Sequence, residues 1–184
     1  MTGHRTSIDE PGHAHELTFS CYRRFRFLES ERTCQWLAEA IDDARTQKSF
    51  LLWAYVFMPD HAHIILLPTD ENHRISSILK AIKAPVGTQA IEFLTVNAPH
   101  WLPRITRTRG QKTERLFWQS GGGYDRNVIV PKTLLKMIDY VHANPVRQQL
   151  VQRPRDWKWS SAAWYDDLTP IPLSVDPIPA DWLD

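Results

Sequence analysis

Two histidines stand one residue apart in the segment MPDHAHIILLP, residues 58–68, as His61 and His63. Alternate residues of a β-strand point to the same face of a sheet, so both imidazoles would lie side by side and offer two ligands to a metal ion. His13 and His15 repeat the same His-Ala-His spacing near the N-terminus. The spacing alone also fits surface or partly buried histidines that bind no metal, so it assigns neither pair.

The context of the two pairs differs. An apolar run follows His63 and would fix the ligands of that pair on a strand that begins after a proline turn. His13 and His15 are expected to lie in an arm rich in Gly and Pro, which would hold metal ligands poorly. The context therefore favours His61 and His63 over His13 and His15, although further evidence is needed to assign a metal site to either pair.

A second group of reactive side chains lies on a helix predicted from Pro131 to Asn144. Lys136, Tyr140 and Asn144 are spaced i, i+4 and i+8, so they form one row beside the apolar face of that helix. The row offers a cation, a phenol and a carboxamide. It also has a purely structural interpretation, because Tyr is common at the edge of an amphipathic helix and Asn before Pro145 commonly ends one.

Three segments carry a resemblance to a known family. MPDHAHIILLP, then YVHANPVRQQLV, then DWKWSSAAWY resemble, in this order, the REP-associated tyrosine transposases and related HUH single-strand DNA transposases, the IS200-like family. The match runs from about residue 15 to residue 165, and the joint order of the segments is far more specific than any one of them.

The resemblance implies a role for each matched residue. In that family the two histidines of the HUH motif, and an amide or carboxylate four residues after the catalytic tyrosine, bind a divalent ion. Carried over, this implies Tyr140 as the nucleophile and His61, His63 and Asn144 as ligands of Mg²⁺ or Mn²⁺. Ala62 departs from the family, which usually has a bulky hydrophobic residue there; the change would weaken strand packing locally but leaves both ligands.

The implied activity is cleavage and rejoining of single-stranded DNA. Tyr140 would attack phosphorus in line, giving a 5′-phosphotyrosine link and a free 3′-hydroxyl. Lys136 either helps the weakly acidic phenol to react or is simply a solvated lysine. No nucleotide cofactor is expected, because the glycines at 121–123 lack the lysine of a phosphate-binding loop. Tyr124 is a competing nucleophile, although no spacing of metal ligands accompanies it.

Two other functions remain open. One is a catalytically silent regulator of the same fold that binds DNA or RNA, against which the intact Tyr140 and histidine pair argue. The other is a metal-dependent phosphodiesterase that acts through water, in which Tyr140 would be structural.

The charge is unevenly distributed. Residues 101–158 hold 12 Lys or Arg and 4 Asp or Glu, whereas residues 159–184 hold 5 acidic residues and no Lys or Arg. Clustered cations favour a polyanion, since they neutralise phosphates and release counterions, although a solvated surface has the same composition. We expect single-stranded DNA, with hairpins implied by the resemblance, and the candidate contacts are Arg104, Arg107, Arg109, Lys112, Arg115, Arg126, Lys136 and Arg147.

The length of 184 residues fits one domain. No stretch has the roughly 20 apolar residues of a membrane span, and the first residues do not read as a signal peptide. We therefore expect a cytoplasmic protein, a monomer or a homodimer, in which Cys21 and Cys34 are free thiols.

Three regions are expected along the chain: a flexible arm at 1–14, the HUH transposase domain at 15–152, and a Trp-rich, acidic tail at 153–184 packed on the domain. Trp157, Trp159 and Trp164 of this tail either stack on bases or, more simply, pack against the body.

The order of elements predicts an α+β fold, ferredoxin-like (RRM-like), with an antiparallel sheet, helices packed on one face and the HUH histidines on a central strand. The expected elements are a strand at 15–22, a helix at 31–47 capped by Ser30, strands at 49–57 and 61–67, a helix at 74–95 that Pro85 should kink or split, a basic loop at 97–115, a strand at 116–130 interrupted by glycines, and the helix at 131–144.

Overall fold

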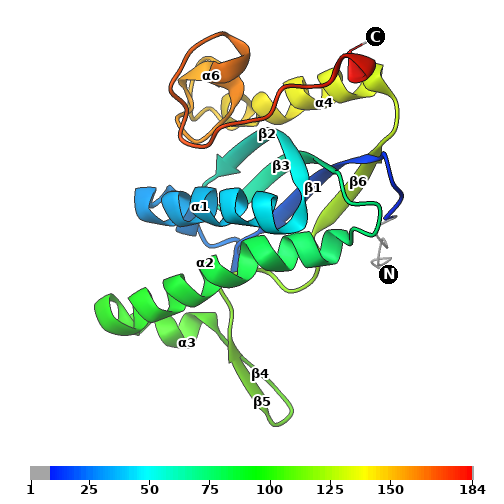
Figure 1. Ribbon diagram of the computed structural model, residues 1–184. Helices are drawn as coiled ribbons and strands as arrows, with labels where there is room; N and C mark the ends of the chain where they lie inside the picture. Colours follow the sequence, from blue (N-terminus) through cyan, green and yellow to red (C-terminus); the bar gives the residue numbers. More distant parts are fainter. Residues whose placement is uncertain (1–8, 184) are drawn as a thin grey trace.

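A four-stranded antiparallel sheet forms the centre of the computed structural model, which describes residues 9–183 (Figure 1). The strand order is β2-β3-β1-β6, with β1 at Ala14–Ser20, β2 at Phe50–Met58, β3 at His61–Pro68 and β6 at Tyr124–Val128. The long helices are α1 (Glu31–Lys48), α2 (Ile75–Asn97) and α4 (Pro131–His142). The predicted antiparallel sheet with helices is confirmed. Most of the predicted arm lies outside the described residues.

β3 is a central strand, as predicted for the histidine pair. It pairs with β2 on one side and with β1 on the other, and the turn at Pro59 and Asp60 joins it directly to β2. Its apolar residues alternate between the two faces of the sheet: Ala62, Ile64 and Leu66 belong to one core cluster, and Ile65 belongs to the other. Because the period of a strand is two, His61 and His63 lie on the same face as Ile65.

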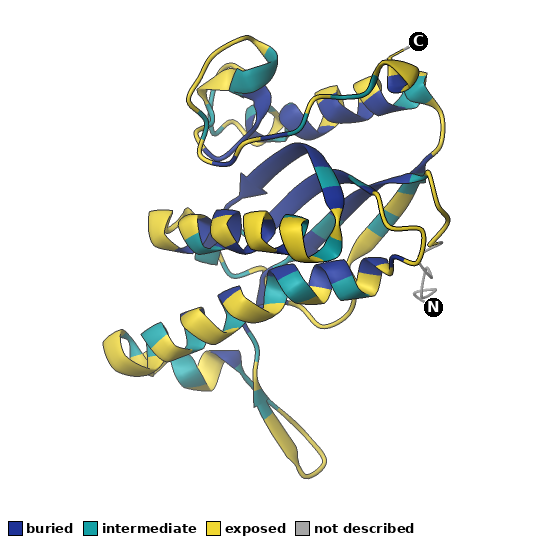
Figure 2. Ribbon diagram, in the orientation of Figure 1, coloured by how far each residue is buried: buried dark blue, intermediate teal, exposed yellow. Residues whose placement is uncertain are grey.

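Helices cover both faces of the sheet, whereas the sequence analysis placed them on one. α1 and α2 pack on the face of Ile64, and α4 packs on the face of Ile65 (Figure 1). The physical reason is that β2 and β3 are apolar on both sides, so each face has to be covered. Figure 2 shows these strands buried and the outer surfaces of the helices exposed. α4 therefore lies over the two histidines.

α2 is one continuous helix across Pro85. Pro85 is exposed, so the missing backbone donor faces solvent, while Ile78, Ile82 and Val86 are buried on the other side of the helix. Burial of this apolar stripe offsets the cost of an interior proline. The predicted split is therefore wrong.

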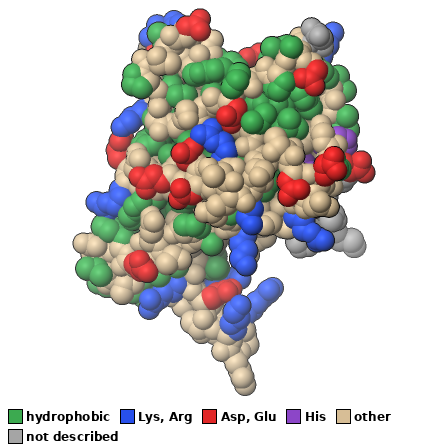
Figure 3. Space-filling model, viewed as in Figure 1, with side chains coloured by type: hydrophobic (Ala, Val, Ile, Leu, Met, Phe, Trp, Pro, Cys, Tyr) green, Lys and Arg blue, Asp and Glu red, His purple; other side chains and the backbone are tan. Residues whose placement is uncertain are grey.

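The segment predicted as a basic loop at 97–115 is structured. It contains α3 (Leu102–Ile105) and a hairpin of β4 (Thr106–Arg109) and β5 (Lys112–Arg115), which leaves the body beside α2 (Figure 1). We call β4 and β5 the basic hairpin. Cross-strand pairs stabilise it, including an ion pair of Arg107 with Glu114. Figure 3 shows Lys and Arg side chains on this hairpin and on the adjacent surface of the body.

The strand predicted at 116–130 is confined to β6. Gly123 has a φ of +80°, and a Cβ at this position would lie 2.1 Å from the carbonyl oxygen of Thr18 on β1. Only glycine permits this approach. The glycines at 121–123 thus bring the chain against β1 at the start of β6.

The C-terminal segment closes the free edge of β2. The backbone of Phe57 donates to Trp159 at 2.8 Å, and that of Ser161 donates to Tyr55 at 3.0 Å. The Trp157 indole donates to the carbonyl of Phe57, and Trp159 stacks on the Phe57 ring. Of the two interpretations of the tail tryptophans, the structure shows packing.

The same segment holds α4. His142, near the end of α4, lies 2.8 Å from the Ser161 hydroxyl, which also accepts from the backbone of Tyr55. Burial lowers the pKa of His142 to about 4, with a smaller opposing effect of Asp166. The neutral imidazole therefore joins α4, β2 and the C-terminal segment.

The remaining short elements are α5 (Asn144–Arg147), α6 (Ala162–Tyr165) and 3₁₀ turns at Tyr22–Arg24, Phe27–Glu29, Pro99–Trp101, Pro154–Asp156 and Ala180–Trp182.

Within residues 9–183, no helix has the length and apolar character to cross a bilayer. Cys21 and Cys34 are buried free thiols, as predicted.

His142 predicts a pH dependence of stability. Its pKa is lower in the folded chain than the ordinary 6.5, so the unfolded chain binds the proton more tightly and folding stability falls as pH drops below 6.5. Between pH 7 and pH 5 we expect this residue to cost about 2 kcal/mol of the free energy of unfolding. Urea unfolding with chelator present measures the loss. His142→Gln should remove that share of it, and an unchanged pH dependence in this variant contradicts the assignment.

Candidate active site between the sheet and α4

His61 and His63 meet on the face of the sheet that α4 covers. Their Nε2 atoms are 3.1 Å apart, and the residues are 6% and 8% exposed. The rings are held from behind: Nδ1 of His61 lies 2.6 Å from a carboxylate oxygen of Asp60, and Nδ1 of His63 lies 2.8 Å from the Thr18 hydroxyl. The Glu16 carboxylate lies 3.7 Å from the same Nδ1. These contacts turn both Nε2 atoms toward a common point.

This arrangement fits a divalent cation. Two nitrogens about 2.1 Å from one ion and roughly at right angles to each other lie about 3 Å apart, which matches the observed separation. Histidine ligands of metals usually donate the N–H of the other ring nitrogen to an oxygen atom. Here the Nδ1 atoms of His61 and His63 lie within hydrogen-bond distance of Asp60 and Thr18. Burial lowers the pKa of His61, which favours the neutral form that binds metal.

The histidines do not complete a site by themselves. Among residues 9–183, no three His, Cys, Asp or Glu side chains are grouped so that they could hold a metal ion. A third protein ligand would have to come from another residue type.

A pocket of about 520 Å³ opens beside His63 and is lined by side chains of four elements. β1, β3 and β6 form its floor and α4 forms its wall, so residues far apart in the sequence meet there. We call it the α4 pocket; it is lined by Glu16, Thr18, His63, Tyr124, Arg126, Thr133, Lys136, Met137 and Tyr140. The predicted residues His63, Lys136 and Tyr140 are thus brought together, and His61, which does not line the pocket, contacts His63.

Tyr140 is the accessible phenol of α4. Tyr140 is 54% exposed and does not belong to the core. The Arg147 guanidinium lies 4.2 Å from the centre of the Tyr140 ring and donates to the backbone carbonyl of Tyr140 at 3.1 Å. Arg147, predicted to contact DNA, therefore also holds the tyrosine.

Asn144 lies beyond the end of α4, whereas Lys136 and Tyr140 of the predicted row lie on it. α4 ends at His142, and Asn144 begins α5, with Pro145 in the first turn of that short helix. The Asn144 amide nitrogen donates to the carbonyls of Tyr140 and Val141 at 3.2 and 3.0 Å. Its oxygen is the atom that would bind a cation, but Asn144 is not among the residues lining the α4 pocket.

The other histidine pair has different surroundings. His15 is fully buried on the opposite face of the sheet, 2.8 Å from Asp125, and its Nε2 has no hydrogen-bond partner. His13 lies just before β1 and contacts Asn127 at 3.2 Å. These two side chains do not share the geometry of His61 and His63.

The predicted DNA contacts fall into two groups. Arg126 and Lys136 line the α4 pocket, with Arg147 beside it. Arg104, Arg107 and Arg109 lie on α3 and β4 at the other end of the molecule, and Arg104 stacks on Trp101 at 4.1 Å. The two groups do not form one patch.

The sequence analysis missed Glu16, Thr18, Asp60 and Thr133. A signal for two of them was present, because Glu16 and Thr18 alternate with the apolar residues of the predicted first strand. They had to face the side of the sheet opposite to Leu17, but only the pairing of β1 with β3 places Thr18 directly opposite His63.

Comparisons with known proteins bear on the family and the fold of this chain. No protein-family model matches the chain. The sequence is 26% identical over 146 residues to a Haemophilus influenzae protein named as a REP-associated tyrosine transposase, covering 74% of this chain and 77% of the relative. The solved structure of a REP-associated tyrosine transposase bound to a REP hairpin has a TM-score of 0.68 at 22% identity, covering 96% of this chain and 93% of that one.

The class of protein that this chain resembles is thus a tyrosine transposase. The predicted likeness to the REP-associated tyrosine transposases in particular is confirmed, in sequence by the curated relative and in fold by the solved structure.

The exposure of the tyrosines can be tested chemically. Tyr140 and Tyr124 are 54% and 42% exposed, whereas Tyr22 and Tyr55 are buried and burial raises the pKa of Tyr165. Mild nitration should therefore modify Tyr140 and Tyr124 first and spare the other three. Peptide mass spectrometry gives the order of modification, and prior reaction at Tyr55 or Tyr165 would contradict the placement of α4 and the C-terminal segment.

Proposed function

We propose that this protein is a metal-dependent tyrosine transposase that nicks and rejoins single-stranded DNA in the cytoplasm through a 5′-phosphotyrosine intermediate. The observation that carries the proposal is the α4 pocket, where the exposed Tyr140 shares one cavity with His63 of the histidine pair. The likeness to a tyrosine transposase in sequence supports the same class.

Tyr140 would be the nucleophile. Its phenolic oxygen forms a bond to the scissile phosphorus as the bond to the 3′-oxygen breaks, which leaves a 3′-hydroxyl and a covalent protein–DNA link. Reversal of the step by another 3′-hydroxyl rejoins a strand without an external energy source. Arg147, whose guanidinium lies over the Tyr140 ring, would orient the phenol, and Lys136, one turn earlier on α4, places a positive charge in the same pocket.

His61, His63 and Asn144 would hold Mg²⁺ or Mn²⁺. When bound, such an ion neutralises charge on the phosphate and stabilises the charge that develops there. Imidazole ligands suit manganese better than magnesium. Asp60 and Thr18 would orient the two imidazoles, and Arg126 would contact a non-bridging phosphate oxygen or a neighbouring phosphate.

The proposed partner is single-stranded DNA with a hairpin. The solved relative is bound to a REP hairpin, and this chain carries cations both at the α4 pocket and on α3 and the basic hairpin. Arg104, Arg107 and Arg109 would contact the DNA backbone at a distance from the cleavage site, which gives affinity without sequence reading.

The deciding experiment is a search for the covalent intermediate. The protein is incubated with labelled, hairpin-bearing single-stranded DNA and Mn²⁺ or Mg²⁺, and the products are separated under denaturing conditions. We expect a protein–DNA adduct that Tyr140→Phe abolishes and that Tyr124→Phe, the matched control in the same pocket, retains. An adduct that survives in Tyr140→Phe refutes the assigned nucleophile.

The same assay separates the rival functions. DNA binding without cleavage would indicate a silent regulator, and cleavage without an adduct would indicate a phosphodiesterase that uses water. His61→Ala should abolish cleavage, whereas His13→Ala should not; equal losses would overturn the choice of histidine pair.

Asp60 tests the metal site independently of cleavage. Removing the charge behind His61 should weaken Mn²⁺ binding by about 10- to 100-fold, the usual effect of losing a residue that orients a metal-binding histidine. Calorimetric titration of Asp60→Asn with Mn²⁺ measures this. Asp125→Asn is the matched control, because Asp125 makes the equivalent contact with His15. Identical affinities in wild type and Asp60→Asn would exclude this role.

A further inference from the structure

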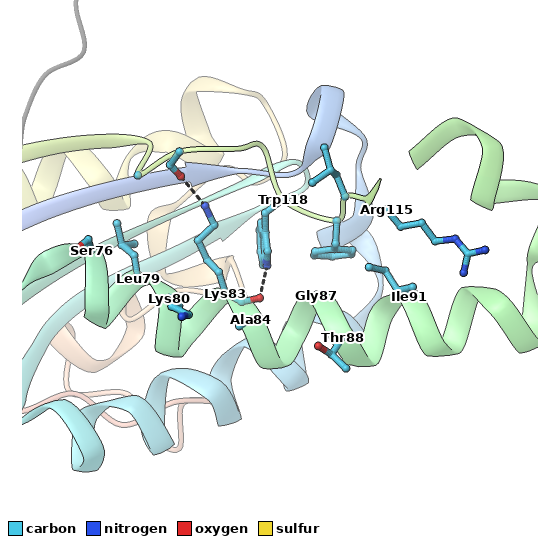
Figure 4. A pocket seen from close by; sticks show the side chains of 14 residues that line it. Ser76, Leu79, Lys80, Lys83, Ala84, Gly87, Thr88, Ile91, Arg115 and Trp118 are labelled. Carbon is cyan, nitrogen blue, oxygen red and sulfur yellow. Dashed lines mark hydrogen bonds between the residues drawn. The ribbon is translucent and has the colours of Figure 1, made fainter. Parts of the chain in front are cut away.

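A second groove of about 520 Å³ lies on the face of the sheet opposite to the α4 pocket (Figure 4). α2 forms one wall, and the segment from the end of β5 to the glycines forms the other. We call it the α2 groove; it is lined by Ser76, Leu79, Lys80, Lys83, Ala84, Gly87, Thr88, Ile91, Arg115, Leu116, Phe117, Trp118, Gly121 and Gly122.

The charges of the α2 groove are all of one sign. Lys80, Lys83 and Arg115 line it, and no Asp or Glu is found among the described residues of the lining. Lys83 donates to the carbonyls of Gln119 at 3.3 Å and Gly121 at 3.0 Å. Burial lowers the pKa of Lys83. An anion in the groove would compensate this unfavourable burial, so the electrostatics favour a negatively charged ligand.

The inner surface of the groove is apolar and rigid. Phe117 and Trp118 are buried, and the Phe117 ring stacks on Phe27 at 5.0 Å. The Trp118 indole donates to the carbonyl of Lys83 at 2.9 Å (Figure 4). Gly87 faces these aromatic side chains: a Cβ there would lie 3.8 Å from Trp118. A larger side chain at position 87 would therefore project into the space that the glycine leaves open.

The groove also adjoins the basic hairpin. Arg115 is the last residue of β5, and the chain passes from it directly into Leu116 and the aromatic residues of the groove wall. A polyanion bound along the hairpin would therefore meet Arg115 at the entrance of the α2 groove.

We propose that the α2 groove binds an unpaired nucleotide of the DNA, with the base against the apolar surface and its phosphates near Lys80 and Arg115. Cations beside an apolar, aromatic surface are the combination that holds single-stranded nucleic acid, since every base has an apolar face. The volume lies in the range of about 300–1,000 Å³ typical of small-ligand sites. This inference rests on the proposed DNA substrate, but not on Tyr140 or the metal.

The test blocks the groove without disturbing the core. Ala84 is exposed on α2 and lines the groove, so Ala84→Trp should fill it; Gln89→Trp is the matched control at an exposed position of α2 outside the lining. Lys80→Glu reverses one charge, and Lys48→Glu is its control outside the groove. Binding is measured by fluorescence anisotropy with a hairpin that carries unpaired flanks and with the same hairpin without them.

We expect Ala84→Trp and Lys80→Glu to weaken binding of the flanked hairpin by roughly tenfold, the order of one lost base contact. The controls, and binding of the flankless hairpin, should change little. DNA with 5-bromodeoxyuridine in each unpaired position should crosslink on irradiation to residues of the groove, and Ala84→Trp should suppress this.

Equal affinities of wild type and Ala84→Trp for the flanked hairpin would overturn the inference, as would crosslinks confined to the α4 pocket. Both results leave the proposed function intact if the Tyr140 adduct still forms. Absence of any DNA binding by the wild type would instead refute the proposed function itself.

Discussion

The burial of β3 on both faces and its pairing on both edges constrain the whole candidate site. The strand is fixed by β1 and β2 in the plane of the sheet, by Ile64 against α1 and α2, and by Ile65 against α4. His61 and His63 have no freedom to move with a loop, and their second nitrogens are held by neighbouring strand and turn residues. Burial, and to a smaller degree the neighbouring His63, lowers the pKa of His61, which favours the neutral form of this imidazole.

The sequence analysis predicted the strands of the sheet, the long helices and the histidine pair, because each is encoded locally in apolar spacing. It could not place α4 on the opposite face, since the choice of face depends on β2 and β3 being apolar on both sides. The basic hairpin was missed because Arg and Lys, with little alternation of apolar residues, give no strand pattern. The grouping of Thr18 with His63 depends on strand register, which the spacing of a single strand does not contain.

For the helix that carries Tyr140, too, part of the structure was predictable from the sequence and part was not. The position of the tyrosine on an amphipathic helix was predictable from the spacing of residues 134–141. The break between His142 and Asn144 was not, because α5 begins at Asn144 and Pro145, in its first turn, continues the chain in a helical turn. The Ser161 hydroxyl, 19 residues away, fixes the end of α4 through His142. The C-terminal segment thereby becomes part of the framework of the site, although it supplies no lining residue.

Gly123 and His63 both contact Thr18 of β1. The backbone of Gly123 lies against Thr18, and the Thr18 side chain holds His63 on the other face of the same sheet. One residue of β1 therefore contacts both the glycine segment and an imidazole beside the α4 pocket. A side chain at position 123 would displace the backbone of Thr18, and with it the hydroxyl that orients His63, so the glycine is a requirement of the histidine pair as well as of β6.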